Sequence, residues 1–291
     1  MTPAPRFAAR ALACALAITA TAAAATPATA KAPTRIVALT PFTANTLAHL
    51  GIKPVGIGQT LGGHDKLDPA LKSVKTLPLS HPAGPNLEQL AALNPQLVLS
   101  TPTWQRGETA MRKLGMKVVD VEPRSLAEVA VDTKRIGALV GRTAQANRLA
   151  TQIDRGIANA QKNIRKHPTV LLIIGVGRTP YAALENSWGG DVVKKAGGRL
   201  LTRGLRASGG FARISNETVV ERDPDVIIAV PHGAAGDIPR LARYLKTNPA
   251  WKTTKAARNK RIYVSTGNSL LQAWTDAGRT ISDVRRSFLK N

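Results

Sequence analysis

Cysteine is almost absent from this sequence, and the single one, Cys14, lies in an apolar N-terminal stretch. With that stretch removed the chain has no thiol, which excludes disulfide scaffolds, cysteine-ligated zinc or iron–sulfur sites and cysteine nucleophiles. The segments G-x-S-x-G, H-E-x-x-H and G-x-x-x-x-G-K-S/T, which carry common hydrolase, zinc-protease and nucleotide-binding chemistry, do not occur either. The sequence therefore gives no indication of an enzyme.

Acidic and aromatic residues are also scarce. There are 18 Asp+Glu against 41 Lys+Arg in 291 residues, a formal net charge of +23, and aromatic residues make up 4%. So much positive charge suits an anionic partner such as nucleic acid, anionic lipid or an acidic ligand. Nucleic acid is not expected, because the basic residues are spread along the chain and no zinc-finger or RNP-like segment is present.

The N-terminus has the pattern of an export signal. Arg6 and Arg10 precede an apolar, alanine-rich stretch that ends in A-x-A-like sites and is shorter than the roughly 20 residues of a membrane span. The pattern predicts a signal peptide over residues 1–30 and a periplasmic location for the mature chain. A lipid anchor at Cys14 is not expected, because Ala11 stands where a lipobox usually has leucine.

From residue 35 onward, short apolar runs alternate with helical patterns. The runs expected to form buried strands cover residues 35–39, 54–58, 96–100, 117–121, 169–177, 225–230 and 261–265. Such alternation is typical of α/β domains with mostly parallel sheets. It predicts two Rossmann-like α/β lobes, an N-terminal one over residues 31–142 and a C-terminal one over residues 168–291. Near the end of the first lobe, Ser125 and Glu128 have the S-x-x-E spacing of a helix capping box.

A long helix is expected between the two lobes. From Thr143 to about Lys166, apolar residues recur with a 3.6-residue period, and His167 and Pro168 then end the pattern. About 23 helical residues span roughly 34 Å, which is long enough to cross from one lobe to the other. The sequence therefore predicts a linking backbone helix over residues 143–167, with a crossover helix inside one sheet as the alternative.

Several segments together resemble a known family. They are RIVALTPFTANTLAHLGIKPVGIG, PNLEQLAALNPQLVLS, KHPTVLLIIGVG, DVVKKAGG, ISNETVVERDPDVIIAV and WKTTKAARNKRIYV. In this order they are similar to the helical-backbone (class III) solute-binding proteins of ABC importers for siderophores, cobalamin and haem. The resemblance implies two α/β lobes joined by one long rigid helix, with the ligand in the cleft between them. It also implies a monomer that delivers its ligand to an ABC permease with its ATPase, supplied in some systems through an outer-membrane receptor.

The C-terminal half is most similar to the haem receptor lipoproteins of iron-regulated surface determinant systems. The similar segments are HPTVLLIIGV, TPYAALENSWGGDVVKKAGG, PDVIIAVPHG and KTNPAW. The resemblance implies haem as the transported ligand, with His232 at the position of the histidine that ligates the iron. The second axial ligand of those proteins is a methionine, and here Ala83 occupies its position. His81 is the candidate replacement, so bis-histidine and five-coordinate iron both remain open, and a ferric siderophore or cobalamin remains the alternative cargo.

Aromatic and basic residues of the C-terminal half complete the candidate site. Tyr181, Trp188 and Trp274 are expected to line the cleft and to stack on a flat macrocycle, with core packing as the alternative. The arginines that could pair with carboxylates of an anionic ligand, unless they are simply solvated, are Arg178, Arg203, Arg206 and Arg213.

Two carboxylates and three further histidines have other expected roles. Glu88 and Glu217 each lie early in a helix, where a carboxylate stabilises the N-terminus, and the resemblance implies that they dock to the permease. His64 is a weaker ligand candidate in a glycine-rich loop, whereas His49 and His167 are expected to be structural.

Overall fold

The computed structural model describes residues 1–2, 31–59, 67–81, 83–177, 179–206, 208–233 and 235–290. The chain forms two compact units, Met1–Lys31 and Ala32–Asn291, and all sheets, helices and cavities described below belong to the second. Most of the predicted signal peptide, together with Cys14, His64 and Arg178, lies outside the described residues.

The first sheet is parallel and has the strand order β3-β2-β1-β6-β7. Its strands are β1 Ile36–Ala38, β2 Gly56–Gly58, β3 Thr76–Leu77, β6 Leu97–Ser100 and β7 Val118–Asp120. The strands β1, β2 and β6 are buried along their whole length, which explains why their sequences are mostly apolar. The four strands predicted for the first lobe are confirmed.

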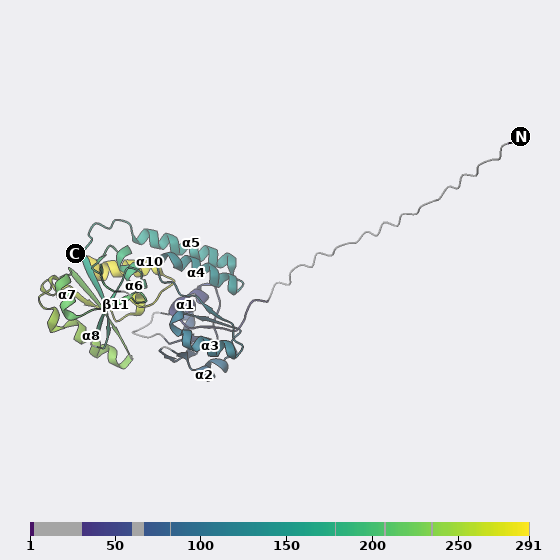
Figure 1. Cartoon of the computed structure of the whole chain (residues 1–291), viewed down its shortest axis with the longest axis horizontal. Helices are drawn as coiled ribbons and strands as arrows, with labels where there is room; N and C mark the ends of the chain where they lie inside the picture. The colour runs from purple at the N-terminus through teal and green to yellow at the C-terminus, as the bar shows by residue number, and fades with distance from the viewer. Residues whose placement is uncertain are drawn as a thin grey trace. The chain divides into compact units, whose positions relative to one another are not determined.

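Three helices accompany this sheet, as Figure 1 shows: α1 Pro41–His49, α2 Leu87–Ala91 and α3 Gln105–Lys113. The first begins directly after β1 because Thr40 caps it: its hydroxyl accepts the N–H of Thr43 at 3.2 Å. A small hairpin of β4 Leu79–Ser80 and β5 Gly84–Pro85 precedes α2. The hairpin places His81 at its turn, beside the edge of the lobe where the site lies.

The second sheet is mixed. Its strands are β8 Thr169–Val176, β9 Thr179–Ala183, β10 Arg199–Leu200, β11 Phe211–Arg213, β12 Val226–His232 and β13 Ile262–Val264. The parallel strands β8, β12 and β13 confirm the prediction, but β9, which pairs antiparallel with β8, and β11, which pairs antiparallel with β9, were not expected. The chain reverses after β8 because Gly177, with φ of 60°, allows the tight connection between the paired residues Val176 and Thr179.

The remaining helices form the connection and complete the second lobe, and short 3₁₀ turns occur in both lobes. The helices are α4 Leu126–Leu139, α5 Thr143–Ala160, α6 Trp188–Lys195, α7 Asn216–Arg222, α8 Ile238–Lys246, α9 Lys255–Arg258, α10 Ala277–Val284 and the π-helix Arg285–Leu289. The 3₁₀ turns are Pro69–Leu71, Pro102–Trp104, Ala235–Asp237, Pro249–Trp251 and Asn268–Leu270. None of the helices in the described part of the chain has both the length and the apolar character needed to cross a membrane. The fold class is thus confirmed as two α/β lobes, while their boundaries stay predictions.

The connection between the lobes differs in detail from the expectation. The helix α5 ends at Ala160, short of the predicted residues 143–167, and it packs against both α4 and α10 (Figure 1). The chain after it turns at Asn163, whose φ is 57°, and the guanidinium of Arg285 donates to the carbonyl of Lys162 at 2.7 Å. This hydrogen bond satisfies a backbone acceptor that continued helix would otherwise satisfy.

The predicted capping box at Ser125 is wrong. The Ser125 side chain makes no capping hydrogen bond with any described residue. The Glu128 carboxylate instead accepts the backbone N–H of Arg124 at 2.7 Å. The carboxylate thus satisfies a donor one residue earlier than the box requires.

The two lobes share one core and several hydrogen bonds. The main buried cluster includes residues of both sheets, among them Ile36, Leu97, Val170 and Ile228. The hydroxyls of Thr46 and Thr275 form a hydrogen bond of 2.9 Å. The backbone N–H of Leu126 donates to Asp191 Oδ2 at 2.8 Å, and that of Ala273 donates to Glu122 Oε1 at 3.4 Å. These contacts hold the lobes together in addition to the helices.

Glu122 is unusual among these contact residues. Its Oε2 atom is buried and has no hydrogen-bond partner among the described residues. Burial raises the pKa of this carboxyl group to about 8, although hydrogen bonds from Thr40 and Ala273 oppose the shift. The group is therefore neutral over most of the physiological pH range.

The crossing of α5 and α10 gives a first prediction. A Cβ on Gly278 would lie 2.5 Å from the carbonyl carbon of Gly156, whereas a Cβ on Gly156 would meet only the Cα of Gly278, at 3.9 Å. Gly278→Ala must push the helices apart and should cost about 1–3 kcal/mol of unfolding free energy. Gly156→Ala, the matched control, should instead add about 0.5–1 kcal/mol by lowering backbone entropy. Urea unfolding measures both, and two changes of the same sign would contradict the crossing.

The pKa of Glu122 gives a second prediction. The unfolded chain loses this proton near the ordinary value of 4.5 and the folded protein near 8, so wild-type stability falls as pH rises between these values. Glu122→Gln cannot ionise and should gain up to about 1.4 kcal/mol per pH unit over wild type in this range. Unfolding at pH 5 and pH 8 measures the gain, with Glu221→Gln, which removes an exposed carboxylate, as control. An equal stability difference at both pH values would contradict the assignment.

Candidate ligand-binding site

A cavity of about 340 Å³ lies between the lobes. Residues of the first lobe that line it are His81, Thr103 and Trp104, and those of the second are Ile174, Val176, Tyr181, Phe211, His232, Leu271 and Gln272. We call it the histidine cavity. Its second-lobe wall is formed by the ends of β8 and β12 and by the antiparallel strands β9 and β11, at the edge where open α/β sheets usually bind ligands.

His232 is the last residue of β12, where it pairs with Val176 of β8. The imidazole is half-buried, and its Nδ1 atom has no hydrogen-bond partner among the described residues. Desolvation, and to a lesser degree the charge of His81, lowers the pKa of His232 below the usual value of 6.5. The ring is therefore neutral at neutral pH, which is the form that binds a metal.

His81 enters the cavity from the other lobe. It follows β4 in the hairpin, and its exposed ring meets the indole of Trp104 edge-on, with centroids 6.0 Å apart. Gly84, at φ 84°, lets the hairpin come close to Trp104, because a Cβ there would lie 3.2 Å from the Trp104 Cβ. The structure thus brings His81 and His232 to one cavity, while the neighbouring Ala83 is exposed.

A second cavity, of about 520 Å³, adjoins the first and shares four lining residues with it: Thr103, Phe211, Leu271 and Gln272. We call it the Glu122 cavity, since Glu122 lines it together with Arg124, Asn186 and Trp188. Asn186 and Trp188 flank Ser187, the N-cap of α6. This cavity has more polar side chains than the histidine cavity.

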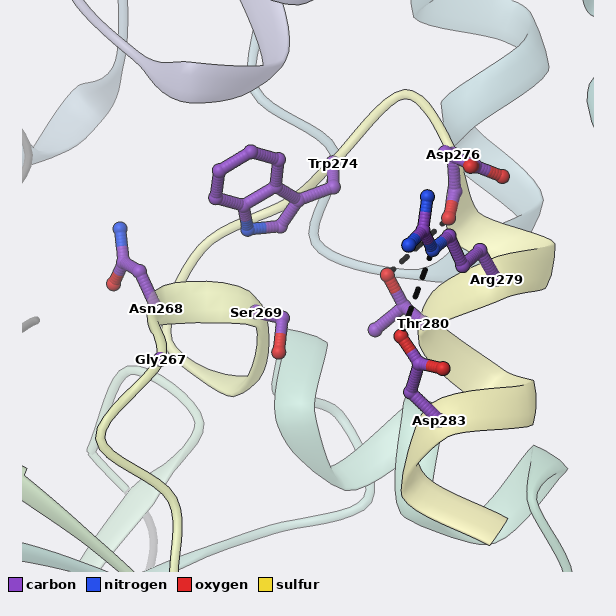
Figure 2. Close-up of a pocket in the computed structure, with 8 residues that line it drawn as sticks. All are labelled: Gly267, Asn268, Ser269, Trp274, Asp276, Arg279, Thr280 and Asp283. Atoms are coloured by element: carbon purple, nitrogen blue, oxygen red, sulfur yellow. Dashed lines mark hydrogen bonds and ion pairs between the residues drawn. The ribbon is translucent and has the colours of Figure 1, made fainter. Parts of the chain in front are cut away.

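The predicted aromatic residues occupy three different places. Tyr181, on β9, lines the histidine cavity. Trp188 is 5% exposed, lines the Glu122 cavity and donates from Nε1 to the carbonyl of Ser269 at 2.8 Å. Trp274 lines a third cavity of about 230 Å³, beside Arg279 and Asp283, whose Nε and Oδ2 atoms are 3.8 Å apart (Figure 2).

The predicted polar residues lie on the surface. Arg203, Arg206 and Arg213 are exposed and are not among the described residues that line the two adjoining cavities. His49 is exposed at the end of α1, and His167 Nδ1 lies 3.2 Å from the carbonyl of Gly197.

Glu88 and Glu217 lie in the first turns of α2 and α7, one on each lobe. Both are exposed, and a hydrogen bond with Ser215 holds the pKa of Glu217 below its usual value. Both carboxylates are thus accessible to a partner.

Sequence reasoning missed three residues that shape the site. Phe211 belongs to a strand that was not predicted, and Trp104 lies in a short Pro-Thr-Trp turn that follows no regular sequence pattern. Glu122 carried a usable signal, because it follows the end of a predicted parallel strand, where ligand sites gather. Among the described residues there is no cluster of three or more His, Cys, Asp or Glu side chains that could hold a free metal ion.

Comparison with known proteins is consistent with this geometry. The family model of the periplasmic binding protein matches residues 36–268. The high-affinity heme uptake system protein IsdE of Staphylococcus aureus (strain MRSA252) is 29% identical over 216 residues, which are 68% of this chain and 73% of that protein.

Solved structures share the fold over nearly the whole chain. An ABC transporter substrate-binding protein from Listeria monocytogenes EGD-e has a TM-score of 0.74 at 26% identity, covering 90% of this chain and 100% of its own. IsdE of S. aureus complexed with heme has a TM-score of 0.73 at 27% identity, covering 88% and 99% respectively. The chain therefore belongs to the periplasmic binding protein family, whose members are solute-binding proteins of ABC transporters and not enzymes.

Proposed function

We propose that this protein is exported to the periplasm, captures haem between its lobes and delivers it to an ABC permease. The observation that carries the proposal is the pair of imidazoles, His81 and His232, on opposite walls of one cavity. Iron in a porphyrin needs only one or two axial ligands from the protein, and neutral imidazole is a common one. The similarity to IsdE, whose name and structure refer to heme, supports this cargo.

The walls of the cavity suit a flat, apolar ring system. Tyr181 and Phe211 line the cavity from the second lobe, and Trp104 lines it from the first. The aliphatic side chains of Ile174 and Val176, at the end of β8, also line it. Aromatic rings stack favourably on a macrocycle and bury much of its apolar surface. His232 ligates the iron, and His81 serves as the second axial ligand in place of the methionine that the resemblance to the haem receptor lipoproteins implies at Ala83.

The ligand assignment is tested by absorbance titration of the apo protein with hemin. His232→Ala should shift the Soret band and weaken hemin binding at least about tenfold, which is 1.4 kcal/mol. His81→Ala should change the spectrum of the bound state through its second ligand. His49→Ala is the control. It removes an exposed imidazole at the last residue of α1 and should behave as wild type.

Two results would contradict haem as the cargo. One is the absence of a Soret change in excess hemin, and the other is equally tight binding without the His232 side chain. Titrations with a ferric siderophore and with cobalamin run beside the hemin titration. Tight binding of either one that does not depend on His232 would favour the alternative cargo.

Glu88 and Glu217 are proposed to dock the two lobes to arginines of the permease. Glu88→Ala combined with Glu217→Ala should leave hemin binding unchanged but reduce stimulation of the ATPase of the reconstituted transporter several-fold. Because both carboxylates are exposed, the wild-type stimulation should weaken as salt is added. Glu221→Ala, on the same helix as Glu217, is the matched control. Equal stimulation by the double variant and by this control would refute the docking role.

A further inference from the structure

The Glu122 cavity adjoins the histidine cavity, since Thr103, Phe211, Leu271 and Gln272 line both. The histidine cavity alone, at about 340 Å³, is near the lower end of the range of roughly 300–1,000 Å³ for small-molecule sites. A macrocycle held between the two imidazoles would need more room than this, and the adjoining Glu122 cavity offers about 520 Å³.

The polar groups of the Glu122 cavity do not satisfy one another. Glu122 Oε1 accepts a long bond from the Ala273 N–H, at 3.4 Å, the Thr40 hydroxyl also interacts with the carboxyl group, and Oε2 has no partner within hydrogen-bond distance among the described residues. Arg124 is exposed, and its guanidinium makes no ion pair or hydrogen bond with the described part of the chain. Buried polar groups in proteins are normally hydrogen-bonded, so the unpaired Glu122 Oε2 marks a place for a further polar partner.

The groups that face Glu122 act on its pKa in opposite directions. From α4 comes the carboxylate of Asp132, which disfavours a second negative charge, and from the N-terminus of α1 comes the hydroxyl of Thr40. The C-terminal segment offers only the backbone N–H of Ala273. Burial, with a smaller contribution from the charge of Asp132, outweighs the two hydrogen bonds, which lower the pKa, and raises the pKa of Glu122 to about 8, so the group is a hydrogen-bond donor at neutral pH.

We propose that the Glu122 cavity receives a carboxylate of the cargo, to which the Glu122 carboxyl group donates a hydrogen bond while Arg124 supplies positive charge. The inference rests on the proposed function and adds a specificity element to the same cleft. The terminal torsion of a glutamate side chain has a broad and shallow preference, so the carboxyl group can turn to present either oxygen to the cargo. The cargo it selects is a porphyrin or similar chelate with an acidic edge.

The hydrogen bond makes binding depend on pH with a definite sign. Cargo carboxylates are ionised above about pH 5, while Glu122 keeps its proton up to about pH 8. Above that value Glu122 loses the donor and becomes a like charge beside the cargo. The part of the affinity that depends on the cargo carboxylates should therefore fall about tenfold between pH 7 and pH 9.

The test compares hemin with hemin dimethyl ester, which has the same ring and iron but no free carboxylates. We use the ratio of the affinity for hemin to the affinity for hemin dimethyl ester. Effects of pH on the iron and on the imidazoles are common to both ligands and cancel in this ratio. For wild type, this ratio should fall about tenfold from pH 7 to pH 9. Glu122→Gln, whose amide still donates but cannot ionise, should keep the pH 7 ratio within about threefold and abolish the fall.

Two further variants separate the roles. Arg124→Ala should lower the ratio at every pH and leave its decline with pH unchanged. Glu221→Gln, an exposed carboxylate on α7, should match wild type throughout. Melting curves of each apo variant confirm that it is folded.

The possible failures are distinguishable. If wild type binds neither porphyrin, the proposed function fails, and this inference fails with it. If wild type binds both but the ratio is the same at pH 7 and pH 9, or Glu122→Gln declines as wild type does, the inference alone is overturned and haem capture stands.

Discussion

The fixed position of one lobe against the other is the constraint on which the candidate site depends. His81 and His232 belong to different lobes, so neither lobe alone forms the cavity between them. The close approach of Gly156 and Gly278, and the hydrogen bond between Thr46 and Thr275, hold this position. A wide hinge motion would break a shared core, so we expect little closure on ligand and a release that needs the permease to draw the lobes apart.

The sequence predicted those parts of the fold that local patterns determine. Strands such as β8 and β12 are buried on both faces and are therefore continuous apolar runs, which are recognisable without any tertiary information. The strand β9 was missed because its direction depends on the turn at Gly177, and β11 because it has only three residues. The end of α5 was also out of reach, since Arg285, far away in sequence, satisfies the carbonyl at the turn that follows.

Some residues of the candidate site could likewise be predicted from the sequence, and others could not. His232 and His81 could be proposed because the resemblance to haem receptors pointed to them, and the structure brings both to one cavity. Trp104 and Phe211 could not, because their place in the wall depends on how the hairpin and β11 pack. Trp274, which was expected to line the cleft, lines the third cavity, whereas its neighbours Leu271 and Gln272 line the two adjoining ones.

The proposed role of Glu122 raises a question: the protein has a net charge of +23, yet the group proposed to bind the acidic edge of the cargo is a carboxylic acid. A buried arginine would bind a carboxylate through a paired, charge-assisted contact, which is strong and slow to break. A neutral acid contributes a single hydrogen bond and costs folding stability, because its ionised form is poorly solvated where it lies. A transport receptor must release what it captures, so a weaker contact that orients the acidic edge is better suited to transfer than a permanent ion pair. In the proposed role, the exposed Arg124 attracts the cargo and the buried acid sets its orientation, which divides capture and positioning between two side chains of one loop.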